Sequence, residues 1–320
     1  MIYVLYKKVE TRRFTSFLYV NLAMADLLVT CVVMPHQLQT ILMDTRWFGG
    51  AFGEFLAKFV VFTFFVALMA SIYFLTAIAF DCFFSIVFSL RQFPRFRSKK
   101  LLVPCIWLFS MSAMSPWLII IGAKDVTGNG QHFVIEHKFS RLGEKDLSVR
   151  GVYLYTITIT YALPLGIMSV LYGYICQRLR LHQIPGASVH NDKARLRVNK
   201  TKRQIIKMSV AMVITFALCW LPTHICHAML AIDLNWAFTK FPSFEYFMLV
   251  SYWLGHANSA VKPWMLIYFK KRFRSVFRKM ITHPLSRLSA ASRTSQDTAT
   301  KRPSFKVAPA AQPVQITTHL

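Results

Sequence analysis

Long apolar blocks constrain the fold of this chain more than any other feature of its sequence. Five of them occupy residues 55–80, 101–122, 152–175, 205–232 and 246–269. Each is about 20 residues or longer, which lets a helix cross the roughly 30 Å hydrocarbon core of a membrane. A sixth block, 15–38, carries one internal acid, Asp26. Because backbone groups in lipid must be hydrogen-bonded within their own segment, the blocks predict an all-α membrane protein rather than a soluble domain.

The distribution of charge predicts how these helices are oriented. The net charge is +25, and the bases gather before residue 14, at 91–100, at 178–207 and after residue 270. The only acids in these four regions are Glu10, Asp192 and Asp297, whereas segment 122–150 has five bases and four acids. This alternation is the positive-inside pattern, so we expect both termini in the cytoplasm. The basic surface would then face anionic inner-leaflet lipids, and it does not indicate binding to nucleic acid.

The chain divides into a helical bundle, residues 1–280, and a polar tail, residues 281–320. At the end of the bundle, segment 270–280 spaces Phe273 and Phe277 four residues apart among bases, which predicts a short amphipathic helix on the inner leaflet. The tail is rich in Ser, Thr, Ala and Pro and is expected to be disordered. Its last residues place Thr318 two positions before the terminal Leu320, a pattern that PDZ domains accept by strand addition.

A set of polar, aromatic and proline residues recurs in order along the blocks. Its members are Asn21, Asp26, Ser71, Asp81, Trp107, Pro116, Pro164, Tyr172, Phe216, Trp220, Pro222, Asn258, Ser259 and Pro263. In this order and spacing the chain resembles the rhodopsin-like (class A) G-protein-coupled receptors, with the blocks matching their helices 2 to 7. The run from Cys219 to His224 is most similar to peptide receptors. Met1–Lys8 resembles the cytoplasmic end of helix 1, so the family's usual start would lie upstream.

The resemblance implies a seven-transmembrane-type bundle with helix 1 truncated, in the plasma membrane as a multi-pass protein. It also implies an extracellular ligand, bound between the helices, and a heterotrimeric G protein as the cytoplasmic partner. The sequence shows no phosphate loop, metal cluster or nucleophile–base pair, so we expect no cofactor, no metal and no enzymatic activity. A polytopic transporter is the outside alternative, although we find no repeated halves of the kind that transporters have.

Three departures from the family pattern fall in its activation switches. The family's Asp-Arg-Tyr is Asp81-Cys82-Phe83 here, and Lys202 stands where many members carry the acid that latches this arginine. In the family's Asn-Pro-x-x-Tyr, Leu266 replaces the tyrosine that links to Tyr172. The third departure is Lys262, which stands where the family has the asparagine of this motif. We therefore expect weak G-protein coupling, and a non-signalling decoy or a truncated, decaying receptor relative is the alternative.

A fourth departure lies outside the membrane. The cysteine that forms the family's extracellular disulfide is replaced by Ala57, and its usual partner segment, 122–150, has no cysteine. All six cysteines of the chain lie within or at the ends of the predicted spans. The sequence therefore predicts no disulfide framework.

Lys262 is the least expected residue of the membrane segments. Helical spacing puts it on one face with Asn258 and Ser259, and the resemblance places these residues with Asp26 and Ser71 in the family's sodium pocket. An unpaired charge near mid-membrane costs at least about 2.5–3.5 kcal/mol. We therefore expect Lys262 to pair with Asp26 and to replace the ion. The alternative is that its four-carbon stem lets the ammonium reach the inner interface.

The ligand pocket is indicated by one helical stripe. Phe216, Trp220, His224 and His227 recur at i, i+4, i+8 and i+11 in block 205–232, and Phe64 lies on a stripe with Ser71 in block 55–80. Phe64, Trp220, His224 and His227 are the candidate ligand contacts, with ordinary core packing as the alternative for each. Amine receptors place an aspartate where Phe64 stands, which disfavours a cationic amine as the ligand. The faces of His224, Cys226 and His227 diverge too much for a zinc site.

Overall fold

The computed structural model describes residues 14–42, 46–87, 99–128, 133–181, 192–233, 237–239, 243–269, 274–275 and 278. The chain divides into two units, Met1–Lys271 and Arg272–Leu320, and the first contains the helical fold. Of the predicted amphipathic helix 270–280, only Arg274, Ser275 and Arg278 are described, and all three are helical. Residues 1–13 and the predicted tail, including Thr318 and Leu320, lie outside the described residues.

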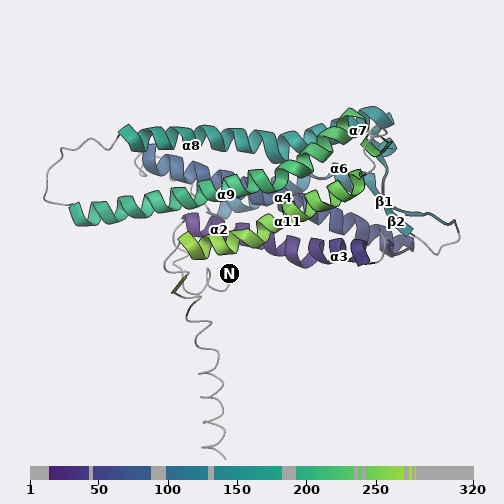
Figure 1. Cartoon of the computed structure of the whole chain (residues 1–320), viewed down its shortest axis with the longest axis horizontal. Coiled ribbons are helices and arrows are strands. Elements are labelled where there is room, and N and C mark those ends of the chain that lie inside the picture. Colours follow the sequence, from purple (N-terminus) through teal and green to yellow (C-terminus); the bar gives the residue numbers. More distant parts are fainter. Residues whose placement is uncertain are drawn as a thin grey trace, which may run out of the picture. The chain divides into compact units, whose positions relative to one another are not determined.

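Long helices run alongside one another through the first unit (Figure 1). Five stretches of the described chain are long and apolar enough to cross a membrane, which agrees with the predicted all-α bundle. They are Phe14–Leu42, Gly50–Val87, Lys100–Ile120, Leu147–Arg178 and Arg203–Ile232. A further helix, α11 (Phe244–Phe269), has the length to span but carries the polar residues His256, Asn258 and Lys262, all of which are buried.

Proline positions explain where the long helices depart from regular geometry. The first stretch consists of α2 (Phe14–Leu28), a π-helical turn η1 (Val29–Val33) and α3 (Met34–Leu42), and the turn ends just before Pro35. A second π turn, η4 (Thr158–Ala162), lies between α7 (Lys145–Ile157) and α8 (Leu163–Leu181), just before Pro164. Helix α5 (Lys99–Ala113) ends just before α6 (Pro116–Ile120). Each irregularity falls where proline lacks an N–H and its ring crowds the preceding turn.

Helix α4 (Gly50–Val87) is the central helix of the bundle. In its most apolar window 72% of residues are buried, against 28–44% in the other four candidate spans. It packs against α2, α5, α8, α9 (Asp192–Ile232) and the hairpin described below. A helix that is apolar on all sides, as α4 is, is expected to be surrounded by protein or lipid. The outer helices expose apolar side chains such as Val170, Leu218 and Trp264, as lipid-facing surfaces do.

A two-stranded hairpin within segment 122–150 was not predicted from the sequence. Strand β1 (Ile121–Asp125) pairs antiparallel with β2 (Phe133–His137), and Ile121 lies opposite His137. The hairpin lies at the end of the bundle where α3 ends and α4 begins (Figure 1). The backbone N–H of Trp47 donates to the carbonyl of Phe133 at 2.7 Å, and that of Lys138 donates to Ile120 at 2.7 Å. These bonds anchor the hairpin without a disulfide, since all six cysteines are free.

Candidate functional site

The most unusual feature of the interior is a buried ion pair that joins three helices. Lys262 on α11 donates to Oδ1 of Asp26 on α2 at 2.7 Å and to the hydroxyl of Ser71 on α4 at 2.7 Å. Ser259, one turn earlier on α11, donates to the same carboxylate oxygen at 3.0 Å. The lysine side chain is 1% exposed. The ammonium therefore lies inside the bundle against the aspartate and does not extend to the interface.

This polar cluster leaves no position for a cation of the kind that the family's sodium pocket holds. Lys262 already provides the positive charge at Asp26, and a second cation beside the ammonium would be repelled. The other carboxylate oxygen, Oδ2 of Asp26, and Oδ1 of Asn258 are buried without a hydrogen-bond partner among the described residues. The residues present thus fit an internal ion pair and do not fit a sodium ion.

Four of the predicted switch residues, Asp81, Cys82, Phe83 and Tyr172, lie in the half of the bundle opposite the hairpin. Asp81 is buried on α4 and accepts a hydrogen bond from the hydroxyl of Thr15 at 2.5 Å. Cys82 is 6% exposed, and Phe83 packs edge-on against Tyr174 of α8 with ring centroids 5.5 Å apart. The neighbouring switch positions Tyr172, Phe216 and Leu266 are buried, and Pro222 and Pro263 lie inside α9 and α11.

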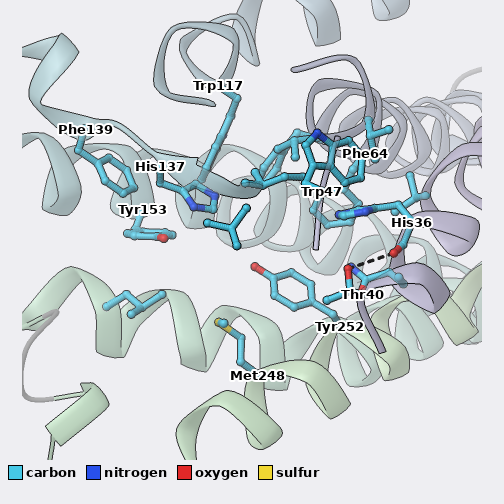
Figure 2. Close-up of a pocket in the computed structure, with 18 of the residues that line it drawn as sticks. His36, Thr40, Trp47, Phe64, Trp117, His137, Phe139, Tyr153, Met248 and Tyr252 are labelled. Atoms are coloured by element: carbon cyan, nitrogen blue, oxygen red, sulfur yellow. Dashed lines mark hydrogen bonds between the residues drawn. The ribbon is translucent and has the colours of Figure 1, made fainter. Parts of the chain in front are cut away.

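A cavity of about 540 Å³ opens at the hairpin end of the bundle. Figure 2 shows side chains from α3, α4, the hairpin, α7 and α11 converging on it. No Asp, Glu, Lys or Arg lines it among the described residues. Its lining comprises Val33, His36, Gln37, Thr40, Trp47, Val60, Val61, Phe64, Phe65, Trp117, Val134, Ile135, His137, Phe139, Tyr153, Leu230, Phe238, Met248 and Tyr252. A concave apolar space with a few polar groups is the usual form of a ligand site.

Of the four predicted ligand contacts, only Phe64 lines this cavity. Trp220 lies one layer deeper, with its ring centroid 5.9 Å from that of Phe64. His227 bonds the hydroxyl of Tyr252, a lining residue, at 3.0 Å, so it supports the wall from behind. His224 packs against Tyr161 at 4.4 Å and does not reach the cavity. The stripe is therefore the layer beneath the cavity.

The remaining lining residues were missed by sequence reasoning. Trp47 lies in the turn before α4, where its indole N–H donates to the carbonyl of Gly53 at 2.7 Å. His137 and Phe139 come from the hairpin and the turn after it, and their rings stack with centroids 6.0 Å apart. Tyr153 and Tyr252 come from α7 and α11. Their aromatic character was the only signal in the sequence, because the segments that carry them meet only in the folded chain.

The deeper layer is tightly packed around Trp220. Gly255 of α11 lies flat against the indole, because a Cβ added at Gly255 would come within 2.8 Å of two atoms of the Trp220 ring. The ring of His256 lies edge-on to the same indole with centroids 5.9 Å apart. The close approach of α9 and α11 at this level therefore depends on a residue without a side chain. Among the described residues no group of three His, Cys, Asp or Glu side chains could hold a metal ion.

Comparison with known proteins identifies what the chain is similar to. The family described as "7 transmembrane receptor (rhodopsin family)" matches residues 1–268. The chain is 26% identical over 282 residues to the RYamide receptor of Drosophila melanogaster, which covers 87% of the chain and 58% of that receptor. It is 28% identical to the Tachykinin-like peptides receptor 99D of the same species, over 86% of the chain and 54% of the receptor. It is 30% identical to the human Substance-K receptor, over 87% of the chain and 67% of the receptor. The chain thus spans between about half and two thirds of the length of these relatives.

The buried pair generates a prediction about stability. Asp26→Asn or Lys262→Met alone should lower the stability of the purified protein by about 3–5 kcal/mol, because each leaves one buried charge without its partner. The double variant Asp26→Asn/Lys262→Met should be less destabilised than either single variant. The measurement is thermal unfolding in one detergent, and Lys58→Met, which breaks the exposed pair between Glu54 and Lys58, is the control with an effect of about 1 kcal/mol or less. Additive losses in the double variant would show that the two side chains are not coupled.

Proposed function

Because the chain belongs to the rhodopsin-like family of seven-transmembrane receptors, we propose that it binds an extracellular peptide in the cavity beneath the hairpin and activates a heterotrimeric G protein weakly. The members of this family are receptors, which confirms that the chain is not an enzyme and excludes the transporter alternative. In the proposed orientation the hairpin end faces outward. The bases of the described helix ends opposite the hairpin, such as Lys100, Arg178 and Arg203, then face the cytoplasm and its anionic lipids.

The observation that carries the proposed ligand class is the chemistry of the cavity. Its walls are aromatic, and Nδ1 of His36 and Nε1 of Trp117 are buried there without a hydrogen-bond partner among the described residues. Such a surface offers stacking and neutral hydrogen bonds but no charge to compensate a carboxylate or an ammonium. The volume of about 540 Å³ suits the uncharged end of a peptide with one or two aromatic side chains. The relatives named for RYamide and tachykinin-like peptides support a peptide over an amine.

We infer weak activation of the G protein from two replaced switch residues. Cys82 is short and uncharged, so it cannot make the contact that the family's arginine makes with an inserted G-protein segment. Leu266 has no hydroxyl, and the hydroxyl of Tyr172 is buried without a hydrogen-bond partner among the described residues. If each lost interaction is worth about 1 kcal/mol, the population of the open state falls about 30-fold. The second candidate function, a decoy that binds without signalling, rests on the same two replacements.

Two further partners remain proposals. Inner-leaflet lipids would bind the basic segment 270–280, and a PDZ domain would bind the terminus formed by Thr318 and Leu320.

The cavity can be tested with the peptides for which the relatives are named. RYamide, tachykinin-like and substance K peptides are offered to the full chain in lipid nanodiscs, and equilibrium binding is measured. At least one should bind, and His137→Ala should weaken that binding by about tenfold, since a polar aromatic ring of the cavity wall is removed. Val126→Ala, at an exposed position on the same hairpin but outside the cavity, is the control and should leave binding unchanged. Binding of none of these peptides, or equal loss in both variants, would contradict the proposed site.

G-protein coupling gives a second test. With the peptide that binds, the unaltered chain should produce little G-protein dissociation, and Cys82→Arg should raise the amplitude several-fold by restoring the family's positive charge. The matched control for added charge is Cys176→Arg, at an exposed position on α8 in the same half of the bundle as Cys82. It should have no such effect. Full amplitude in the unaltered chain would refute weak coupling.

The replaced sodium pocket gives a third test. Melting temperatures are compared in sodium chloride and in choline chloride at equal ionic strength. The unaltered chain should show no sodium-specific stabilisation, whereas Lys262→Asn should show it, because an uncharged oxygen ligand then stands beside a free carboxylate. The double variant Asp26→Asn/Lys262→Asn should lose the effect again. A sodium-specific rise in the unaltered chain is the result that contradicts the ion pair as a replacement for the ion.

A further inference from the structure

A buried hydrogen bond joins α2 to α9 in the half of the bundle opposite the hairpin. The hydroxyl of Tyr19 lies 2.9 Å from the hydroxyl oxygen of Ser209, and both residues are fully buried. Ser209 also lies 3.0 Å from the carbonyl of Ile205 one turn earlier, to which its hydroxyl donates. The serine proton is therefore used within α9. It follows that Tyr19 is the donor to Ser209, and that the bond reaches between helices 190 residues apart in sequence.

The neighbours of this bond are the altered switch residues. The thiol of Cys82 on α4 and the hydroxyl of Tyr172 on α8 both face Ser209. Met208 and Met212, which flank Ser209 on α9, are buried as well. Side chains from four helices, α2, α4, α8 and α9, thus meet around this hydrogen bond.

We propose that Tyr19 and Ser209 are positioning residues that hold α9 in its resting place, about two helical turns from Lys202, where many family members carry the acid of their latch. The proposal rests on the proposed receptor function and adds the residues that regulate it. Cys82 has no charge that could form an ion pair with α9. The uncharged hydrogen bond between Tyr19 and Ser209 holds α9 in its place. Movement of α9 away from α2 breaks this buried hydrogen bond between the two helices, which costs free energy. The resting state is favoured by that difference between the two states.

The reactivity of the native cysteines can report a displacement of α9. Cys82 is 6% exposed because α9 and its neighbours cover it, so displacement of α9 gives a thiol reagent access to its sulfur. Cys226 lies in the half of α9 nearer the hairpin and is 0% exposed, so it reports loosening of the whole bundle. Cys176 is exposed near the end of α8 and serves as the reference for the reagent.

The experiment measures the rate of N-ethylmaleimide modification at each cysteine of the full chain in lipid nanodiscs, by mass spectrometry of its peptides. Tyr19→Phe should raise the rate at Cys82 about fivefold, the factor that corresponds to about 1 kcal/mol for one hydrogen bond, and leave Cys226 unchanged. Ser209→Ala should have a similar effect, and the double variant should add little to either. The control is Tyr73→Phe, which removes a tyrosine hydrogen bond from α4 to Ile159 and not to α9.

An unchanged rate at Cys82 in Tyr19→Phe would overturn the proposal. An equal rise at Cys82 and Cys226, or a rise at Cys82 in Tyr73→Phe as large as in Tyr19→Phe, would also overturn it, because the bond would then be an ordinary structural contact. The measurement needs neither ligand nor G protein. A negative result here therefore leaves the proposed peptide binding and weak coupling to be judged by their own tests.

Discussion

The charge of Lys262 must be compensated inside the bundle, and much of the arrangement follows from that requirement. An ammonium that is 1% exposed at membrane depth requires a carboxylate within bonding distance, and Asp26 on α2 supplies it at 2.7 Å. The same ammonium bonds Ser71, so α2, α4 and α11 are held at one level. A sliding movement of α11 by one turn, about 5.4 Å, would separate the charges without water to replace the contact. The pair thus sets the register of the helices on which both the cavity and the switch residues lie.

How much of this could be predicted depends on how local the physical cause is. Membrane spans can be predicted from the sequence alone, because a helix that crosses lipid needs about 20 apolar residues in succession. The predicted blocks 55–80 and 205–232 accordingly fall within α4 and α9. The pairing of Lys262 with Asp26 was also accessible, since few residues can compensate a buried charge. The hairpin was missed because its strands are only five residues long, and such strands depend on tertiary bonds, here from Trp47 and Ile120.

The cavity shows a different limit of sequence reasoning. Helical periodicity correctly placed Trp220, His224 and His227 on the inner side of α9, since all three are buried. Periodicity states which face is inside, but not whether the interior at that height is filled or open. That depends on how far Trp47, the hairpin and α7 stand from α11, which is a property of the loops. The open space therefore lies one layer further out than the stripe, at Tyr252 and Phe64.

The two ends of the molecule are connected through the helix that carries the stripe. Phe64 lines the cavity and contacts Trp220 on α9. Along α9, Trp220 contacts Phe216, and Ser209, which bonds Tyr19, lies three turns from Trp220. A ligand can move α9 only if it binds the displaced position more tightly than the resting one. In our proposal the Tyr19–Ser209 bond favours the resting position, while Cys82 and Leu266 give the displaced position little in return. The proposed peptide would then bind at one end of the bundle with little change at the other.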